Sequence, residues 1–348
     1  MGDVHIRIEG RAGRITLTRP KALNALSYEM CLAIDAALID WARDDRVALV
    51  MIDAEGEKAF CAGGDIAAIY TTGIEGDYAL ARSFWRDEYR MNARIAEYPK
   101  PVVSFLQGFV MGGGVGLGCH ASHRIVGAAS QIAMPECGIG LVPDVGGTHL
   151  LARAPGQLGA YLGLTGARMG AGDALHAGFA DLFLPEAEWD SAKEALVTSG
   201  EVADLTGETP PEGRLVDSAA LIDGAFGRDS VAAIVAKLAG NDDPLAQKAL
   251  ASLQRNSPLA MACTLEMLRR LGRGSTIRQA LAQEFRGTWR SLEHGDFLEG
   301  IRAAIIDKDK SPRWQHEGPE AVAQAEVDAI LATLGADELS FDGLEEIT

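Results

Sequence analysis

Short apolar segments alternate with turn residues over the first 184 residues of the chain. His5–Glu9 and Arg14–Thr18 alternate apolar and polar side chains on either side of a glycine-containing turn, which predicts a hairpin. Val47–Ile52 is a continuous apolar run, typical of a strand that is buried on both faces. Ser27 can cap a helix that extends to about Arg43. The recurrence of strands, turns and helices predicts a mixed α/β core.

The segment Gln107–Gly147 departs from this regular pattern. Residues 112–118 hold five glycines in seven positions, inside a segment that otherwise reads as a short buried helix. Each interior helical glycine costs about 1 kcal/mol relative to alanine, so the backbone there must approach something closely. Two interpretations stay open: tight packing against a neighbouring segment, or backbone N–H groups that face an anion. Glu136 and Asp144 follow eight residues apart, and these two carboxyl groups favour the second interpretation.

The pattern changes beyond Pro185. Glu201–Gly213 is rich in Gly, Pro, Thr and Glu, which predicts a linker, and amphipathic helical segments follow it. We therefore expect a core over residues 1–200 and a helical region over residues 201–348 that covers the pocket or forms an oligomer interface. The acidic tail after Leu334 is predicted to be mobile.

Composition narrows the class of protein. The chain has 348 residues, with 49 acidic against 32 basic side chains and a net charge of −17, and no basic block that would indicate nucleic acid as a partner. Its five scattered cysteines include no C-x-x-C pair, which predicts reduced thiols, no zinc site and a cytoplasmic location. Pro101–Cys119 carries no charge but contains six glycines, so we interpret it as a buried strand and helix and not as a membrane span.

Several common catalytic motifs are absent. The chain has no G-x-S-x-G nucleophile elbow, no P-loop and no H-E-x-x-H motif. His120 and His123 lie three residues apart without a third ligand, so we expect them to be structural and expect no bound metal.

Four motifs give the chain a resemblance to the crotonase (enoyl-CoA hydratase/isomerase) superfamily. They are Arg19–Leu26, Phe60–Asp65, Gly108–Gly114 and Pro135–Gly147, in the order and spacing of that family. The resemblance implies an α/β fold, a spiral of ββα repeats with a C-terminal helical region, that binds acyl-CoA. It also implies that the N–H groups of Gly64 and Gly113 form an oxyanion hole for the thioester carbonyl.

The same resemblance implies residues that bind the coenzyme A part of the substrate. In this chain they are Asn24, Ala25, Leu26, Ala62, Asp65 and Ile66. Coenzyme A is then part of the substrate, and no separate cofactor is expected.

Within the superfamily the chain looks most like the 3-hydroxyisobutyryl-CoA hydrolases. The hydratase branch carries a catalytic Glu where this chain has Gly116, and usually Gly where this chain has Asp144. The resemblance implies that Glu136 and Asp144 are catalytic and that Glu88 and Gly113 contact the substrate. Glu136 would activate water or attack the carbonyl itself, and Asp144 would hold the 3-hydroxyl group or the water.

The expected reaction is hydrolysis of 3-hydroxyisobutyryl-CoA to 3-hydroxyisobutyrate and CoA, a step of valine catabolism. Two alternatives stay open at this point: an enoyl-CoA hydratase or isomerase that uses Glu136 alone, and a non-catalytic acyl-CoA-binding scaffold. The expected partner is an acyl-CoA small molecule, with no nucleic acid and no membrane. A trimer-based homo-oligomer and a monomer are both compatible with the sequence.

Overall fold

The computed structural model describes residues 2–203 and 205–344, and within them the strands form two sheets. The larger sheet has six strands in the order β1-β2-β3-β5-β7-β9, and the smaller has the order β4-β6-β8. The strands are β1 (Val4–Glu9), β2 (Ala12–Leu17), β3 (Leu49–Ala54), β4 (Ala59–Cys61), β5 (Val102–Leu106), β6 (Phe109–Met111), β7 (His123–Val126), β8 (Gln131–Ala133) and β9 (Leu182–Phe183). Strands β1 and β2 form the predicted antiparallel hairpin, and the other strand pairings in both sheets are parallel.

The chain repeats one unit as it passes between the two sheets. Each unit places one strand in the larger sheet, the next strand in the smaller sheet, and then a helix: β3-β4-α2, β5-β6-α4 and β7-β8-η2. This arrangement confirms the expected spiral of ββα repeats. Parallel strands need such crossover connections, and here the short strand of the second sheet forms part of each crossover.

Helices cover the outside of this spiral in the first 200 residues. Helix α1 begins as predicted after Ser27, whose side chain accepts a hydrogen bond from the N–H of Met30, and it packs against α3. Trp41 on α1 lies over Gly13 of β2, where a Cβ atom would come within 2.4 Å of the indole. The helices of this part are α1 (Tyr28–Ala42), α2 (Ala67–Gly73), α3 (Ala79–Ala96), α4 (Gly113–Gly118), α5 (Gly147–Arg153), α6 (Leu158–Thr165), α7 (Ala171–Ala177) and α8 (Trp189–Ser199), with the single turns η1 (Pro20–Ala22), η2 (Glu136–Ile139) and η3 (Glu186–Glu188).

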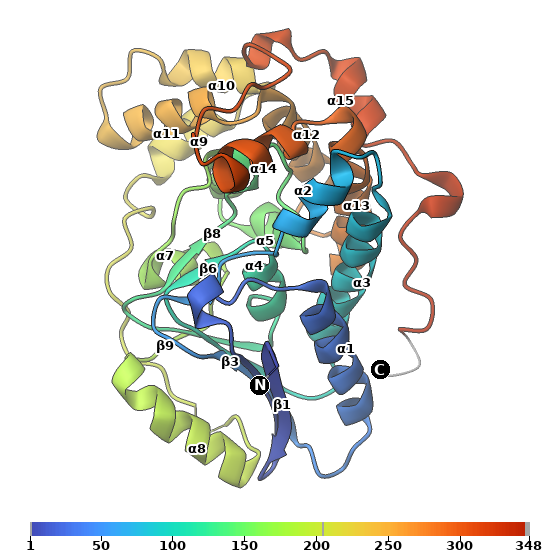
Figure 1. Cartoon of the computed structure of the whole chain (residues 1–348). Coiled ribbons are helices and arrows are strands. Elements are labelled where there is room, and N and C mark those ends of the chain that lie inside the picture. The colour runs from blue at the N-terminus through green and yellow to red at the C-terminus, as the bar shows by residue number, and fades with distance from the viewer. Residues whose placement is uncertain (1, 204, 345–348) are drawn as a thin grey trace.

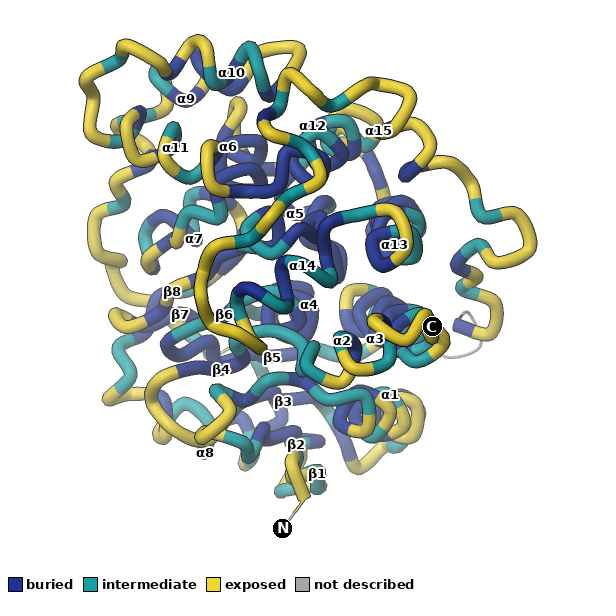
Figure 2. The backbone as a smooth tube through the Cα atoms, turned by 45° about the horizontal axis from the view of Figure 1, so that its top comes forward, coloured by how far each residue is buried: buried dark blue, intermediate teal, exposed yellow. Residues whose placement is uncertain are grey.

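The C-terminal helices lie against the same core. Figure 1 shows α9, α10 and α11 above the small sheet, and α13 beside α3. The burial pattern in Figure 2 shows buried backbone continuing from the strands through α4 and α5 into α12 and α13. These elements are α9 (Ala219–Phe226), α10 (Val231–Leu238), α11 (Pro244–Arg255), α12 (Pro258–Leu271), α13 (Ile277–His294), α14 (Phe297–Ile301), η4 (Arg302–Ile306), η5 (Pro319–Ala321), α15 (Gln324–Ile330) and η6 (Gly335–Asp337).

Two segments differ in detail from their expected forms. Residues 205–213 contain no helix or strand, as a linker should, yet the N–H of Glu208 donates to the carbonyl oxygen of Phe183 at 2.8 Å. The acidic tail, predicted to be mobile, is packed against the protein as far as residue 344. Leu339 and Leu344 are buried there, and Arg90 donates to the carbonyl oxygens of Ser340 and Asp342. The sequence pattern missed these contacts because two leucines among charged residues give no helical or strand periodicity; residues 345–348 lie outside the described part.

No helix in the described ranges combines the length and the apolar character that a membrane crossing requires. All five cysteines fall in described positions, and each is an unpaired, buried thiol.

Candidate active site

The loop after β4 presents one of the two predicted oxyanion-hole amides. Leu26 pairs with this loop in a short parallel bridge: its N–H donates to Gly63 and its carbonyl oxygen accepts from Asp65, both at 2.9 Å. These two bonds use the carbonyl group of Gly63 and the N–H group of Asp65. The N–H of Gly64, which lies between them, points away from Leu26. Within the described residues it donates no hydrogen bond.

The second amide lies at the start of α4. Gly112 has φ +49° and ψ −120°, a conformation that glycine adopts readily, and it turns the chain from β6 into the helix. Gly113 is the first helical residue, so its N–H has no partner within the helix. A Cβ atom on Gly113 would lie 3.5 Å from the nitrogen of Gly64. The two free N–H groups are therefore neighbours, as an oxyanion hole requires.

Within the glycine cluster, some glycines pack tightly against neighbouring segments and others line the site. Gly112 and Gly113 face the site, whereas Gly114 and Gly118 pack tightly. A Cβ atom on Gly114 would come within 2.1 Å of the carbonyl oxygen of Cys61, and one on Gly118 within 2.5 Å of Leu106. The packing of α4 onto β4 and β5 thus fixes the position of the Gly113 N–H group.

Three predicted carboxyl groups meet beside these amides. Glu88 comes from α3, Glu136 from η2, and Asp144 from the loop before α5; their exposed fractions are 3%, 4% and 6%. A Cβ atom on Gly112 would lie 3.1 Å from Oε1 of Glu136, and one on Gly113 would lie 2.9 Å from Oε1 of Glu88. Oε1 of Glu88 and Oε2 of Glu136 have no hydrogen-bond partner in the described part of the chain. Buried oxygens without partners are costly, and these two are free to accept a proton or a hydrogen bond from a bound molecule.

Burial dominates the electrostatics of these groups. It raises the pKa of Glu88 and of Glu136 well above their usual range, and the nearby Asp144 raises both further. Burial also raises the pKa of Asp144, to about 7, while a hydrogen bond from Tyr89 lowers it in part. The hydroxyl of Tyr89 donates to Oδ2 of Asp144 at 2.7 Å. The site can therefore hold and exchange protons near neutral pH.

These groups surround a small cavity of about 110 Å³. Its apolar wall includes Ile66, Phe84, Trp85, Leu141 and Phe297. The apolar side chains exclude water from the carboxyl groups. The volume of the cavity suits a short acyl chain.

The predicted coenzyme A-binding residues divide into two sets. Ala62 and Ile66 line the cavity; Asn24, Ala25, Leu26 and Asp65 do not. The fully buried Asn24 amide donates to the carbonyl oxygens of Glu55 and Ala59 and accepts from the N–H of Arg19. Asp65 pairs with Arg19 at 3.0 Å. The side chains of Asn24 and Asp65 therefore join the loop around Arg19 to β4 and to the loop that carries Gly64.

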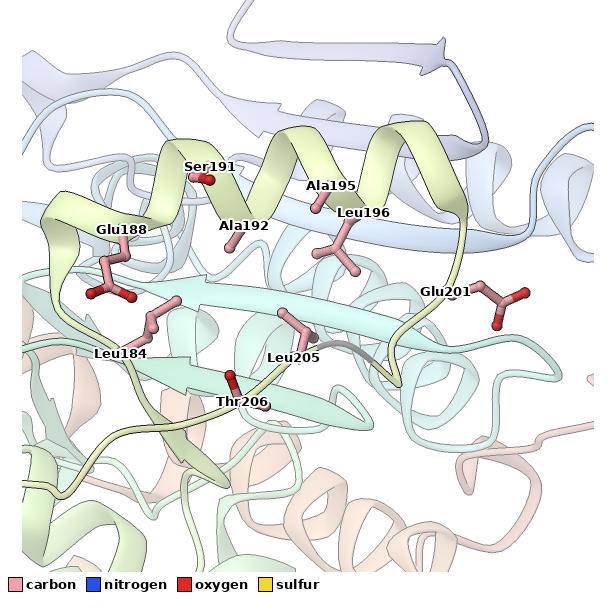
Figure 3. A pocket seen from close by; sticks show the side chains of 9 residues that line it. All are labelled: Leu184, Glu188, Ser191, Ala192, Ala195, Leu196, Glu201, Leu205 and Thr206. Carbon is pink, nitrogen blue, oxygen red and sulfur yellow. The ribbon is translucent and has the colours of Figure 1, made fainter.

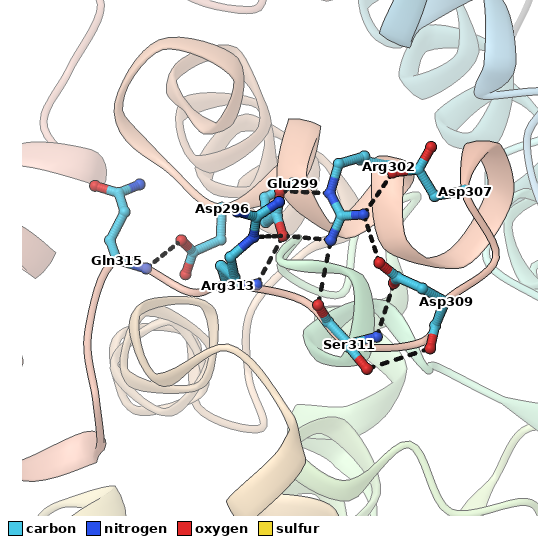
Figure 4. A network of polar contacts seen from close by, with 8 residues as sticks. All are labelled: Asp296, Glu299, Arg302, Asp307, Asp309, Ser311, Arg313 and Gln315. Atoms are coloured by element: carbon cyan, nitrogen blue, oxygen red, sulfur yellow. Dashed lines mark hydrogen bonds and ion pairs between the residues drawn. The ribbon is translucent and has the colours of Figure 1, made fainter.

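Helix α14 supplies part of the cavity wall and is held by a polar network (Figure 4). Asp296 accepts from the hydroxyl of Ser257 at 2.6 Å and from the N–H of Gln315 at 3.0 Å. Arg302 bonds to Glu299, Asp307 and Asp309 and to the carbonyl oxygen of Ser311. These bonds fix the chain on both sides of Phe297.

Two other features of the described residues lack the paired carboxyl groups and free amides of this cavity. A pocket of about 340 Å³ beside α8 is lined mainly by small and aliphatic side chains, among them Leu184, Leu196 and Leu205, and the side chain of Glu201 points away from α8 (Figure 3). His120 is structural, as expected: its Nε2 lies 2.8 Å from the carbonyl oxygen of Val145, and burial lowers its pKa to about 3. Among the described residues, no group of three His, Cys, Asp or Glu side chains is arranged to hold a metal ion.

Sequence reasoning missed the residues behind Asp144. Glu284 and Thr288 on α13 are fully buried and contact the Asp144 loop and Tyr89. An amphipathic helix pattern places such residues on the buried face of α13, but nothing in the sequence indicates which segment they meet. Asn92, one turn beyond Glu88, is also fully buried, and neither of its amide atoms has a partner among the described residues.

A ββα spiral that places free backbone amides beside buried carboxyl groups is typical of enzymes that act on acyl-CoA. The chain belongs to the enoyl-CoA hydratase/isomerase family, the crotonase superfamily, whose family model matches residues 12–331. It is 38% identical to "3-hydroxyisobutyryl-CoA hydrolase, mitochondrial" of Gallus gallus, over 97% of this chain and 90% of the relative. The human protein of the same name is 33% identical, over 97% of this chain and 91% of the relative.

Solved structures that carry other activity names are also similar. An enoyl-CoA hydratase from Rhodobacter sphaeroides 2.4.1 is 60% identical with a TM-score of 0.96, covering 98% of this chain and 100% of that chain. A carnitinyl-CoA dehydratase from Mycobacterium thermoresistibile is 42% identical with a TM-score of 0.94, covering 99% of this chain and 100% of that chain. These similar proteins share one fold but are named for different activities. The activity of this chain therefore has to be inferred from the chemistry of its site.

Proposed function

We propose that this protein is an acyl-CoA thioester hydrolase whose substrate is 3-hydroxyisobutyryl-CoA. The observation that carries the proposal is the meeting of Glu136 and Asp144 beside the free amides of Gly64 and Gly113, with no side chain at Gly116. The named activity of the curated relatives and the small apolar cavity support the same substrate.

In the proposed reaction the thioester carbonyl oxygen accepts hydrogen bonds from Gly64 and Gly113. Glu136 removes a proton from water as the water oxygen bonds to the carbonyl carbon, and the negative charge moves onto the carbonyl oxygen. One good oxyanion donor contributes roughly 3–4 kcal/mol to the stability of this intermediate. The C–S bond then breaks, and the proton from Glu136 goes to the sulfur. Asp144 orients the 3-hydroxyl group or the water, and the mechanism needs no metal or redox cofactor.

A second route uses Glu136 as the nucleophile. Its carboxylate would form a transient anhydride with the acyl group, which water then hydrolyses. After a single turnover in ¹⁸O-labelled water, ¹⁸O in the Glu136 carboxyl group identifies the anhydride route, because direct attack by water on the thioester leaves both Glu136 oxygens unchanged.

Enoyl-CoA hydration is the second candidate, favoured by the activity named for the 60% identical structure. Hydration benefits from two carboxyl groups, and the hydratase position for one of them is Gly116. A Cβ atom there would lie 2.7 Å from Cβ of Val145, 2.8 Å from Nδ2 of Asn92 and 3.0 Å from its Oδ1. The side chain of Asn92 occupies the space that a glutamate at 116 would need. This crowding supports hydrolysis over hydration, and Gly116→Glu is not expected to gain hydratase activity.

The site also argues against an idle binding scaffold. Burial raises the pKa of Glu136 well above its usual range and that of Asp144 to about 7, which suits proton transfer and which binding alone does not require.

One pair of assays tests the proposal. The protein is incubated with 3-hydroxyisobutyryl-CoA while free thiol is followed, and with crotonyl-CoA while the loss of enoyl absorbance is followed. We expect thiol release to be far faster than hydration. Rapid hydration without thiol release would overturn the hydrolase proposal, and no reaction in either assay would favour the scaffold.

A further inference from the structure

The turn that follows Asp144 has a strained backbone. Val145 has φ +54°, a left-handed conformation that is an outlier for a β-branched residue, and Gly146 has φ +79°. A non-glycine residue in this region costs of order 1–3 kcal/mol, so the surrounding structure must impose the conformation. The strain lies directly beside a catalytic carboxyl group.

Glu284 on α13 makes the contacts that impose this turn. Its carboxyl group is fully buried, with Oε2 accepting from the N–H of Gly146 at 2.7 Å and Oε1 from the N–H of Thr148 at 2.9 Å. The hydroxyl of Thr148 donates to Oε1 as well. Glu284 is the acceptor in all three bonds, as a carboxylate is. Burial raises the pKa of Glu284 to about 8, and the hydrogen bonds from Thr148 and Gly146 lower it in part.

The same helix also contacts the hydrogen-bond donor of Asp144. The hydroxyl oxygens of Thr288 and Tyr89 lie 3.3 Å apart, and Tyr89 donates to Asp144. Helix α13 therefore meets Asp144 from two sides, through the backbone of the turn and through Tyr89.

We propose that Glu284 is a positioning residue that holds the Val145–Gly146 turn in its strained form and thereby aims Asp144 at the substrate. The inference rests on the proposed catalytic use of Asp144. It extends the active site to α13, which lies outside the ββα spiral and shares no residue with the oxyanion hole. The C-terminal helical region then orients a reacting group as well as covering the pocket.

Glu284→Gln is the informative change because it keeps the shape and removes the charge. A glutamine amide can accept at one atom only, so the N–H of Gly146 or of Thr148 loses its partner. Displacement of a reacting group by about 1 Å can reduce turnover about 100-fold, so we expect kcat to fall roughly 10- to 100-fold. KM should stay within about threefold, because the oxyanion hole and the apolar wall are unchanged.

The pH profile gives a readout that a purely structural role would not move. The titratable groups around the turn are Glu88 and Tyr89 from α3, Glu136 from η2, Asp144 before the turn, His149 on α5, Glu284 itself, and His120, whose ring contacts Val145. Glu284 is charged above its pKa of about 8, and this charge raises the pKa of Glu136, after burial and Asp144. Glu284→Gln should therefore shift the acidic limb of the kcat profile to lower pH, whereas Glu284→Asp should keep the limb and lose kcat.

Glu293→Gln provides the matched control, since Glu293 lies on the same helix but is exposed and pairs with Arg82 at 2.5 Å. If Glu284→Gln has the kcat and the acidic limb of this control, the inference is wrong. Should Glu284→Gln fail to fold, Thr148→Val removes one of the three donors and should still reduce kcat about three- to tenfold. Wild-type kcat in a folded Thr148→Val protein would then overturn the inference.

The experiments distinguish failure of the hydrolase proposal from failure of the positioning role of Glu284. A wild-type protein that hydrates crotonyl-CoA without thiol release would overturn the hydrolase proposal alone. The same variants are then compared in hydration and by carbon-13 NMR titration of the Asp144 carboxyl group. An unchanged hydration rate and an unchanged Asp144 titration in Glu284→Gln would overturn the positioning role.

Discussion

At the scale of single residues, the site depends on carboxyl groups that are buried without full compensation. Glu136 shows this most clearly, because Oε2 has no partner among the described residues and burial raises its pKa. In free solution a glutamate is a weak base at neutral pH; the raised pKa brings its basicity closer to what proton transfer from water needs.

We predict that Glu136→Gln reduces thiol release at least about 100-fold, since the amide keeps the shape of the side chain but cannot accept a proton. Stopped-flow detection of free CoA measures the change. Calorimetry with a non-hydrolysable 3-hydroxyacyl-CoA analogue is the control and should show affinity within about threefold of wild type. Near-normal turnover would mean that another group activates the nucleophile.

Asp144 links the site to the stability of the fold. Its pKa is about 7 in the folded protein against an ordinary value of 3.8. Between these values the folded state binds more protons than the unfolded state, so its contribution to stability falls as pH rises through this window and stays low above pH 7.

Asp144→Asn removes this penalty because asparagine does not ionise. The three-unit shift sets an upper limit of roughly 4 kcal/mol on the gain in unfolding free energy at pH 8. At pH 4 the variant and the wild type should agree within about 1 kcal/mol. Denaturant unfolding at both pH values measures this difference, and an equal effect at the two values would contradict the assignment. Thiol release should fall in the same variant.

At the scale of elements, α4 has poor intrinsic helix propensity, and close packing against neighbouring segments stabilises it. Gly116 is fully enclosed by Val145 and Asn92. Alanine at this position would improve helix propensity by about 1 kcal/mol, whereas overpacking typically costs about 1–3 kcal/mol. The second effect is the larger one, because the contacts involve the strained turn at Val145.

We therefore predict that Gly116→Ala lowers the unfolding free energy by about 1–2 kcal/mol. Gly224→Ala is the control: Gly224 is also helical, in α9, but no atom lies within 4 Å of its Cβ position. That change should stabilise the protein by about 0.5–1 kcal/mol. Thermal unfolding of the two variants compares packing with propensity directly, and a stabilised Gly116→Ala protein would disprove the proposed crowding.

At the scale of the whole molecule, the spiral and the C-terminal helices share one hydrophobic core. Ile34, Leu106 and Leu151 belong to the same buried cluster as Phe226 and Phe285. The C-terminal region therefore completes the core, and α13 contributes Glu284 behind the site.

Removal of residues 214–348 should leave a protein that does not fold, because the apolar faces of α3, α5 and α6 would lose the helices that cover them. Solubility and thiol release of the fragment Met1–Gly213 measure this. The control is cleavage at an engineered protease site within residues 208–212, which lie in the exposed linker; the nicked protein should stay folded and active. A soluble, active Met1–Gly213 fragment would show that the C-terminal helices are dispensable.

The sequence by itself predicted the alternation of strands, turns and helices, and its resemblance to the crotonase superfamily predicted the ββα spiral that the structure confirms. Apolar runs such as Val47–Ile52 predict buried strands because only such runs can be covered on both faces. The family resemblance predicts that Glu136 and Asp144 lie near Gly113, and in the structure all three line one cavity.

Only the tertiary structure decided how those groups are held. The contacts from Glu284 to Gly146 and from Tyr89 to Asp144 join residues that lie 138 and 55 positions apart, and no local pattern specifies such pairs. The same is true of Asn24, which looks like a ligand contact in its motif but is fully used by backbone partners. Local periodicity reports which face of an element is buried; which residue meets it depends on packing between elements that are distant in the chain.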